Sequence, residues 1–242
     1  MEHDQHFLIN EKIIETSIED VNNDDIVLEI GPGQGILTKK LAVKAKKVIA
    51  VEIDKELEKY LCNLPKNVQI IYANILEKID DLHFDKIIAN IPYSISEPLL
   101  KKLIKTNFEL AILLVGEKFY KLLNGKDKLN VVSKIFFNVE KIIDVPKEDF
   151  SPKPKVNSVL IKITKRTEEL NGNEKIIKEI LLQDDKKLKN ALIYSFVRAE
   201  DLTKKQAKEK INKMKIPKLT LEKNVNQLSN IQFNKLVKSI VA

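Results

Sequence analysis

The chain is poor in cysteine, glycine and tryptophan, and it contains no long apolar run. Its single cysteine, Cys62, cannot form an internal disulfide and has no thiol neighbours for a zinc site, so we expect no metal site. No apolar run approaches the ~20 residues that cross a bilayer. Residues 1–4 have neither the basic start nor the apolar stretch of a secretory signal. These absences predict a cytoplasmic protein that does not enter a membrane.

The distribution of charge is uneven. Of the 242 residues, 43% are hydrophobic and 32% charged, which is typical of a globular protein long enough for a full α/β core and a small second domain. The net charge is +7, but residues 165–242 carry 18 basic and 10 acidic residues, whereas residues 1–164 carry 24 and 25. Clustered basic residues attract a phosphate-rich partner such as a nucleic acid. Solvated faces of lysine-rich helices are the alternative interpretation.

Three of the six glycines lie within five residues, in the turn Gly31-Pro32-Gly33-Gln34-Gly35. The turn follows the apolar run 26–30, which has the length and the β-branched residues of a buried strand, and it precedes a helical pattern. Glycines at such a point let the backbone contact a ligand. The dinucleotide fingerprint G-x-G-x-x-G fails at Ile36, and Pro32 removes one N–H that a phosphate would use. The turn therefore favours an uncharged or cationic ligand.

An acidic residue ends the next apolar run. Glu52 lies 21 residues after Gly31, about the spacing at which an acid at the end of the second strand binds a ribose diol. With a turn that lacks phosphate-binding features, this spacing indicates a nucleoside cofactor, of which S-adenosylmethionine is the common one. Its positive sulfonium fits an acidic lip formed by Glu29, Glu52 and Asp54. A surface acid after a core strand is the alternative for Glu52.

Strand and helix patterns alternate through the first half of the chain. The predicted strands are 26–30, 48–54, 68–72, 86–89 and 110–115, and the predicted helices begin near Asn10, after residue 35 and at Lys55, with another at 97–105. Strands separated by such helices form a mostly parallel sheet that binds ligands at the carboxyl ends of its strands. We therefore expect Gly31, Glu52, Asn74 and Asn90 to meet at one edge of the sheet.

The tetrapeptide Asn90-Ile91-Pro92-Tyr93 directly follows the fourth of these strands. The side-chain oxygen of Asn90 and the backbone oxygens near Pro92 can accept hydrogen bonds from the amino group of a base, while the ring of Tyr93 stacks on it. When these oxygens accept hydrogen bonds from both N–H groups of the amine, they favour a pyramidal, nucleophilic nitrogen. This mechanism needs no residue with a perturbed pKa. Asn90, Pro92 and Tyr93 are thus the predicted catalytic residues. A plain turn before a helix is the alternative.

Five segments occur in a characteristic order: 5–8, 31–38, Glu52, 90–93 and 150–158. In this order they resemble the motifs of the KsgA-type ribosomal RNA adenine dimethyltransferases, and the resemblance covers almost the whole chain. Residues 187–192 also resemble the helical C-terminal domain of that family, and His6 is typical of its archaeal branch. The resemblance implies an α/β protein with a Rossmann-like class I methyltransferase sheet and a small all-helical C-terminal domain.

The resemblance also implies an activity. Such an enzyme moves methyl groups from S-adenosyl-L-methionine to N6 of two adjacent adenosines near the 3′ end of small-subunit rRNA, two per base, during ribosome biogenesis. Its partner is small-subunit rRNA or the pre-ribosomal small subunit, and we expect a monomer. A methyltransferase acting on large-subunit rRNA and a non-catalytic RNA-binding assembly factor are the alternatives. A nucleoside-cofactor oxidoreductase is disfavoured by Ile36 and Pro32.

The family's site residues map onto this chain. The resemblance implies that His6 and Leu8 line the methionine end of the cofactor, that Gly31 contacts the cofactor through its backbone, and that Glu52 holds the ribose. Asn90 is implied to contact both the cofactor and the target amine. Asn74 stands where the family usually has an aspartate that meets the adenine amino group, and an amide oxygen can accept the same bond.

Several positions depart from the family pattern. Asp4 replaces a usual glycine, and residues 116–118 and 128–131 differ on the substrate side, where they would alter RNA contacts. Phe150 either forms part of the wall of a pocket for the target base or belongs to a plain connecting loop before a strand at 159–163.

Beyond Arg166 only helical patterns occur. The predicted helices are 174–182, 186–196, 203–214 and 231–241, and residues 171–173 are the predicted linker. The predicted domains are therefore a methyltransferase domain at 1–165, which binds S-adenosylmethionine, and a basic helical domain at 166–242, which binds RNA.

Overall fold

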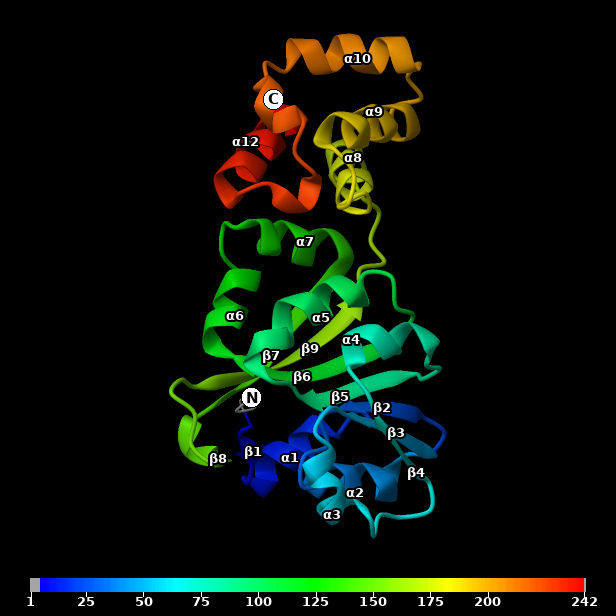
Figure 1. The fold of residues 1–242 in the computed structure, drawn as a ribbon, viewed down its shortest axis with the longest axis vertical. Coiled ribbons are helices and arrows are strands. Elements are labelled where there is room, and N and C mark those ends of the chain that lie inside the picture. The colour runs from blue at the N-terminus through cyan, green and yellow to red at the C-terminus, as the bar shows by residue number, and fades with distance from the viewer. Residues whose placement is uncertain (1–4, 242) are drawn as a thin grey trace. The chain divides into compact units, whose positions relative to one another are not determined.

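The computed structural model describes residues 5–241, which form two compact units (Figure 1). The first unit consists of the chain up to residue 121 together with 138–165, and the second consists of 122–137 together with the chain from residue 166 onward. Asp4 lies outside the described residues. In the described part of the chain, every helix is too short or too polar to cross a membrane.

The first unit contains a seven-stranded sheet with the order β4-β3-β2-β5-β6-β9-β7. The strands are β2 (Ile26–Ile30), β3 (Lys47–Glu52), β4 (Val68–Tyr72), β5 (Lys86–Asn90), β6 (Leu110–Gly116), β7 (Phe137–Val145) and β9 (Ser158–Lys165). Strands β2 to β6 pair in parallel, and β9 is antiparallel to β6. The α/β fold and the mostly parallel sheet expected from the sequence are thus confirmed.

Helices surround this sheet. They are α1 (Glu11–Ser17), α2 (Ile36–Lys44), α3 (Glu58–Leu61), α4 (Ile75–Lys78), α5 (Ser96–Leu103) and α6 (Glu117–Leu123). Helices α1 and α2 contribute apolar residues to a core cluster with one face of the strands. Asn10 caps α1, because its side-chain oxygen accepts hydrogen bonds from two N–H groups of the first turn. The helix predicted from Lys55 is a 3₁₀ turn, Lys55–Leu57, followed by the short α3.

The strand order changes direction next to β2. Strand β2 pairs with β3 on one side and with β5 on the other, so the chain leaves these neighbouring strands in opposite directions. In open α/β sheets such a reversal opens a crevice outside the carboxyl ends of the two strands. Gly31 follows β2 and Asn90 ends β5. The topology therefore places both residues at the crevice.

A second, two-stranded sheet brings together the first and last of the predicted motifs. Strand β1 (Phe7–Leu8) pairs antiparallel with β8 (Phe150–Ser151), and the N–H of Ile9 donates to the Asp149 oxygen at 2.9 Å. Two-residue strands leave no periodic pattern in a sequence, so this pairing was not predicted. It fixes the N-terminal segment against the loop between β7 and β9.

The second unit is built from helices. They are α7 (Lys128–Phe136), α8 (Gly172–Leu181), α9 (Leu188–Ala199), α10 (Lys204–Lys213), α11 (Lys218–Leu221) and α12 (Asn230–Val241). The predicted linker 171–173 is in fact the start of α8. The side chain of Asn171 accepts from the Glu174 N–H, and the Glu174 side chain accepts from the Asn171 N–H, which is a capping box.

The observed units differ from the predicted domains 1–165 and 166–242 at one segment. Residues 122–137 belong to the second unit, because α7 packs against α8 and α12. The buried residues of α7 include Leu129, Val132 and Phe136, so much of its apolar surface is used within this unit. The sequence pattern could not show this, since a helix in the middle of an α/β stretch looks the same whichever unit it joins.

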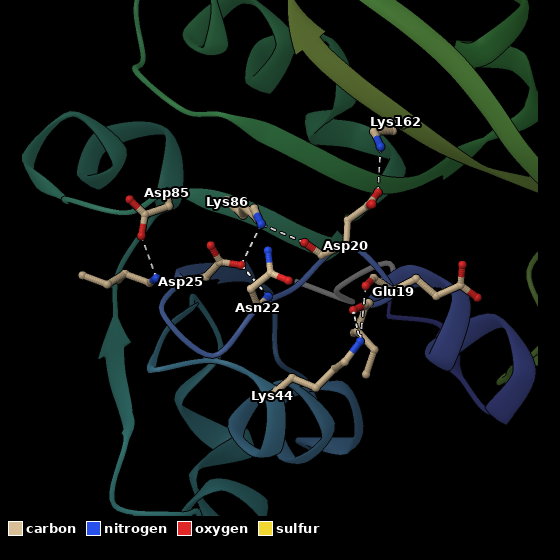
Figure 2. A network of polar contacts seen from close by, with 10 residues as sticks. Glu19, Asp20, Asn22, Asp25, Lys44, Asp85, Lys86 and Lys162 are labelled. Carbon is tan, nitrogen blue, oxygen red and sulfur yellow. Dashed lines mark hydrogen bonds and ion pairs between the residues drawn. The ribbon is translucent and has the colours of Figure 1, made fainter.

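A polar network ties together the other edge of the large sheet, where the strands begin (Figure 2). The Nζ of Lys86, the first residue of β5, lies 2.7 Å from Asp25 Oδ2 and donates to the backbone oxygen of Asp20 at 2.7 Å. Asp25 also accepts from the N–H of Asn22 at 2.6 Å, and the Asp85 carboxylate accepts from the Ile26 N–H at 2.7 Å. The Lys86 side chain is only 8% exposed, so this ion pair is buried.

Replacing Lys86 by methionine tests the contribution of this network to stability. The apolar stem remains, but the nearly buried Asp25 carboxylate loses its counter-charge. We expect the free energy of unfolding, measured by urea denaturation, to fall by about 3 to 5 kcal/mol. The matched control is Lys101→Met, which breaks a half-exposed pair with Glu97 and should cost less than about 1 kcal/mol. Equal losses in the two variants would contradict a structural role for the buried pair.

Candidate active site

The crevice holds a cavity of about 240 Å³. Seven of the eight predicted site residues line it: His6, Gly31, Glu52, Asn74, Asn90, Pro92 and Tyr93. They come from the residue before β1, from the ends of β3 and β5 and from the turns that follow β2, β4 and β5. The eighth, Leu8, is buried in the core and lines a smaller neighbouring cavity together with Gly31 and Asn90.

The glycine turn has a backbone that other residues rarely adopt. Gly31, Gly33 and Gly35 have φ of 71°, 56° and 76°, all in the left-handed region. A Cβ on Gly33 would lie 2.7 Å from Cε1 of Phe7, so only glycine allows the Phe7 ring to close over the turn. The sequence predicted close contact between this turn and a ligand, and here the turn forms one wall of the cavity.

The Glu52 carboxylate is buried and firmly positioned at the end of β3. Its Oε1 accepts from the N–H groups of Ile53 and Asp54, both at 2.9 Å, and its Oε2 accepts from the Gly33 N–H at 3.2 Å. A carboxylate has about four acceptor positions. Glu52 can therefore still accept a hydrogen bond from a ribose hydroxyl.

Asn74 follows β4 and caps α4. Its Oδ1 accepts from the Leu76 N–H at 3.1 Å, and its Nδ2 donates to Glu77 Oε1 at 3.0 Å. The amide oxygen that was predicted to accept a hydrogen bond from an adenine amino group thus also caps a helix. An amide oxygen has two lone pairs, so one acceptor position remains.

Asn90 is fixed by the N-terminal segment. Its Nδ2 donates to the backbone oxygen of His6 at 2.8 Å. This bond assigns the amide nitrogen to His6 and leaves the amide oxygen, Oδ1, as the group that can accept a hydrogen bond from a ligand. Sequence reasoning proposed the same oxygen as an acceptor but did not identify what orients it.

The Tyr93 ring is held at both ends. Its hydroxyl lies 2.7 Å from the Oγ of Ser158, which is buried. The ring packs on Gly116, where a Cβ would lie 3.4 Å from two ring atoms, and its centroid is 6.2 Å from that of His6. Gly116, seen in the sequence only as a departure from the family, thus supports Tyr93. Ser158 was part of a predicted motif, but its role was missed.

Residues 5–7 line the cavity, and three hydrogen bonds hold this segment in place. The Gln5 Nε2 donates to Asp54 Oδ2 at 2.9 Å, and the Nδ1 of His6 donates to the Pro152 oxygen at 2.8 Å. The third tie is the bond from Asn90 to His6 described above. This segment therefore forms a wall of the cavity and also orients Asn90 on another wall.

One prediction about a nearby residue is wrong, and one of the two alternatives for Phe150 is not supported. Glu29 was expected on an acidic lip, but it lies in β2, which is central in the sheet and buried on both faces, and is 1% exposed. Burial raises the pKa of its carboxyl from 4.5 to about 8, with the Thr38 hydroxyl opposing the shift and the Glu52 charge adding to it. Phe150 packs in the core with Leu8 and does not line the cavity.

Comparison with known proteins identifies the family. A model of the ribosomal RNA adenine dimethylase family matches residues 1–240. The chain belongs to this family. Members with similar sequences include proteins named "Probable ribosomal RNA small subunit methyltransferase A". The Methanococcus maripaludis (strain S2) protein is 37% identical over 209 residues, or 79% of this chain and 78% of that protein. The Methanococcus vannielii protein is 34% identical over 96% of both chains.

One solved structure agrees with this assignment to the rRNA adenine dimethylase family, and a second shares the fold. A dimethyladenosine transferase from Plasmodium falciparum is 25% identical and has a TM-score of 0.64, with 96% of this chain and 97% of that chain covered. The 23S rRNA methyltransferase ErmE is 22% identical with a TM-score of 0.62, covering 98% and 100% of the two chains, and shows the shared fold. The Rossmann-like methyltransferase fold expected from the sequence is confirmed.

The buried Glu29 should make stability depend on pH. Between its unfolded pKa of 4.5 and its folded pKa of about 8, the folded protein holds a proton that the unfolded chain lacks. The free energy of unfolding that Glu29 contributes therefore falls as pH rises through this range. As pH rises, the free energy of unfolding of the Glu29→Gln variant should increase relative to that of wild type, by up to about 1.4 kcal/mol per pH unit. Urea denaturation at several pH values from 5 to 8 measures both free energies. If their difference did not change with pH, the raised pKa of Glu29 would be contradicted.

Proposed function

We propose that this chain is an S-adenosylmethionine-dependent rRNA adenine dimethyltransferase that forms N6,N6-dimethyladenosine at two adjacent adenosines near the 3′ end of small-subunit rRNA during ribosome biogenesis. The family match over residues 1–240 and the relatives named as small-subunit methyltransferases support this proposal. The observation that carries it is the position of Asn90. Its amide is oriented by His6 in the same cavity as the glycine turn and the Glu52 carboxylate.

The residues present fit S-adenosylmethionine. The Glu52 carboxylate would hold the ribose, Gly31 would contact the cofactor through its backbone, and His6 would line the methionine end. Asn74 would accept from the adenine amino group with the lone pair that α4 does not use. When bound, this cofactor supplies an electrophilic methyl group on a positively charged sulfur.

The chain's own contribution is to prepare the target amine. The Oδ1 of Asn90 and the backbone oxygens before Tyr93 accept hydrogen bonds from the two N–H groups of the adenine amino group. As a result, the nitrogen lone pair is no longer conjugated with the ring and can attack the methyl group. The Tyr93 ring, fixed by Ser158 and Gly116, stacks on the base. Because hydrogen-bond acceptors do this work, no general base is required before methyl transfer.

Substitution of Asn90 by alanine tests this role. It removes the acceptor oxygen and also the bond to His6. We expect methyl transfer to small subunits to fall by roughly 100-fold or more, as for other groups that stabilise a transition state, with a much smaller change in cofactor affinity measured by calorimetry. The control Asn23→Ala changes an exposed asparagine in the loop before β2 and should leave both quantities unchanged. Full activity of the Asn90 variant would refute the proposed role.

The substrate can be identified directly. The protein is incubated with a labelled methyl donor and, separately, with small subunits isolated before dimethylation and with large subunits, and methylated adenosines are mapped. We expect label at two adjacent adenosines near the 3′ end of small-subunit rRNA. Label on the large subunit alone would overturn the assignment. Cofactor binding without label on either subunit would point to a non-catalytic assembly factor.

A further inference from the structure

The positive charge of the chain is concentrated in one short stretch. Residues 204–218 contain seven lysines and a single acidic residue, Glu209, which gives a net charge of +6 against +7 for the whole chain. In the structure this stretch is α10, the turn that follows it and the first residue of α11. Six of its lysines are exposed and are called here the α10 lysine surface: Lys204, Lys205, Lys208, Lys213, Lys215 and Lys218.

These six lysines differ from the seventh. Lys210 is partly buried, pairs with Glu200 at 2.7 Å and lies 4.6 Å from the centre of the Phe196 ring. The other six form no ion pair with any described residue. Their charges are therefore available to an external partner, whereas that of Lys210 is used within the fold.

The exposed lysines at the start of α10 do not help the helix to form. Lys204 and Lys205 occupy the first turn, where the helix dipole disfavours positive charge, and no acidic residue is present there. Lys204 and Lys208 are four residues apart, a spacing at which like charges repel. Lys215 has a φ of 51°, in the left-handed region that favours glycine. The helix begins instead with a capping box between Thr203 and Gln206.

We propose that the α10 lysine surface binds the phosphate backbone of RNA. The inference rests on the proposed function for the identity of that RNA, which is the rRNA that carries the target adenosines. Clustered, unpaired lysines gain binding energy by releasing counterions from phosphates, independently of base sequence. The buried residues of α10 are Ala207 and Ile211, and α10 packs against α9, so its apolar side is already used. A helix that binds a membrane surface needs such a side to be free, so the helix favours RNA over a lipid surface.

The test compares two variants that lose the same charge. The first changes Lys204, Lys205, Lys208 and Lys213 to glutamine. The control changes four exposed, unpaired lysines of the first unit to glutamine, namely Lys39, Lys46, Lys66 and Lys105. Binding of a hairpin from the 3′ end of small-subunit rRNA is measured at several potassium chloride concentrations, without a methyl donor. Each lost phosphate contact lowers the slope of log affinity against log salt by about 0.7 to 0.9, so we expect the first variant to lose roughly 2 to 4 from the slope. We expect the control to keep the wild-type slope.

A second measurement separates binding from folding. The first variant loses unfavourable charges at the start of α10 and one favourable charge, Lys213, in its last turn, so its melting temperature should stay close to that of wild type, and its affinity for the cofactor should not change. Unchanged salt slopes in the first variant would overturn the proposal. The proposal would also be overturned if the first variant bound RNA as wild type does but no longer bound phosphatidylglycerol vesicles. If RNA binding falls as expected but neither subunit is methylated by wild type, this inference stands and the proposed function fails.

Discussion

The hydrogen bond from the Asn90 amide to the His6 backbone oxygen joins residues 84 positions apart, and the orientation of the Asn90 amide in the cavity depends on it. The bond forms only if the N-terminal segment is held in place, which the pairing of β1 with β8 and the contact of Phe7 with Gly33 ensure. The amide of Asn90 is therefore oriented before any ligand binds. Orientation of this kind lowers the cost of reaching a transition state, because no group has to reorganise during the reaction.

The two edges of the large sheet serve different purposes. At the edge where strands begin, Lys86 and Asp25 satisfy each other's charge in a nearly buried pair. At the opposite edge, backbone oxygens and amides are arranged around an open cavity, and the buried Glu29 retains a side-chain oxygen without a hydrogen-bond partner among the described residues. Such an unsatisfied group costs stability. The buried charged groups at the two edges thus differ in how fully their hydrogen-bonding capacity is used.

The strands and the residues at their carboxyl ends could be predicted from the sequence, because strands buried on both faces appear as continuous apolar runs. Strands 26–30 and 68–72 have the predicted bounds. The burial of Glu29 was missed because a single acidic residue in an apolar run is expected to be exposed to solvent. The contact between Tyr93 and Ser158, and the pairing of β1 with β8, join distant segments through one or two residues each. No local pattern records such contacts.

The assignment of residues 122–137 to the second unit affects how relatives of this protein can be recombined. The chain enters that unit, leaves it and returns, so the helical part is not a simple C-terminal attachment. A chimera that exchanges only the residues after 165 would combine α7 of one parent with α8 and α12 of another, and their packed surfaces would not match. Only chimeras that inherit both segments from the same parent preserve the interior of this unit.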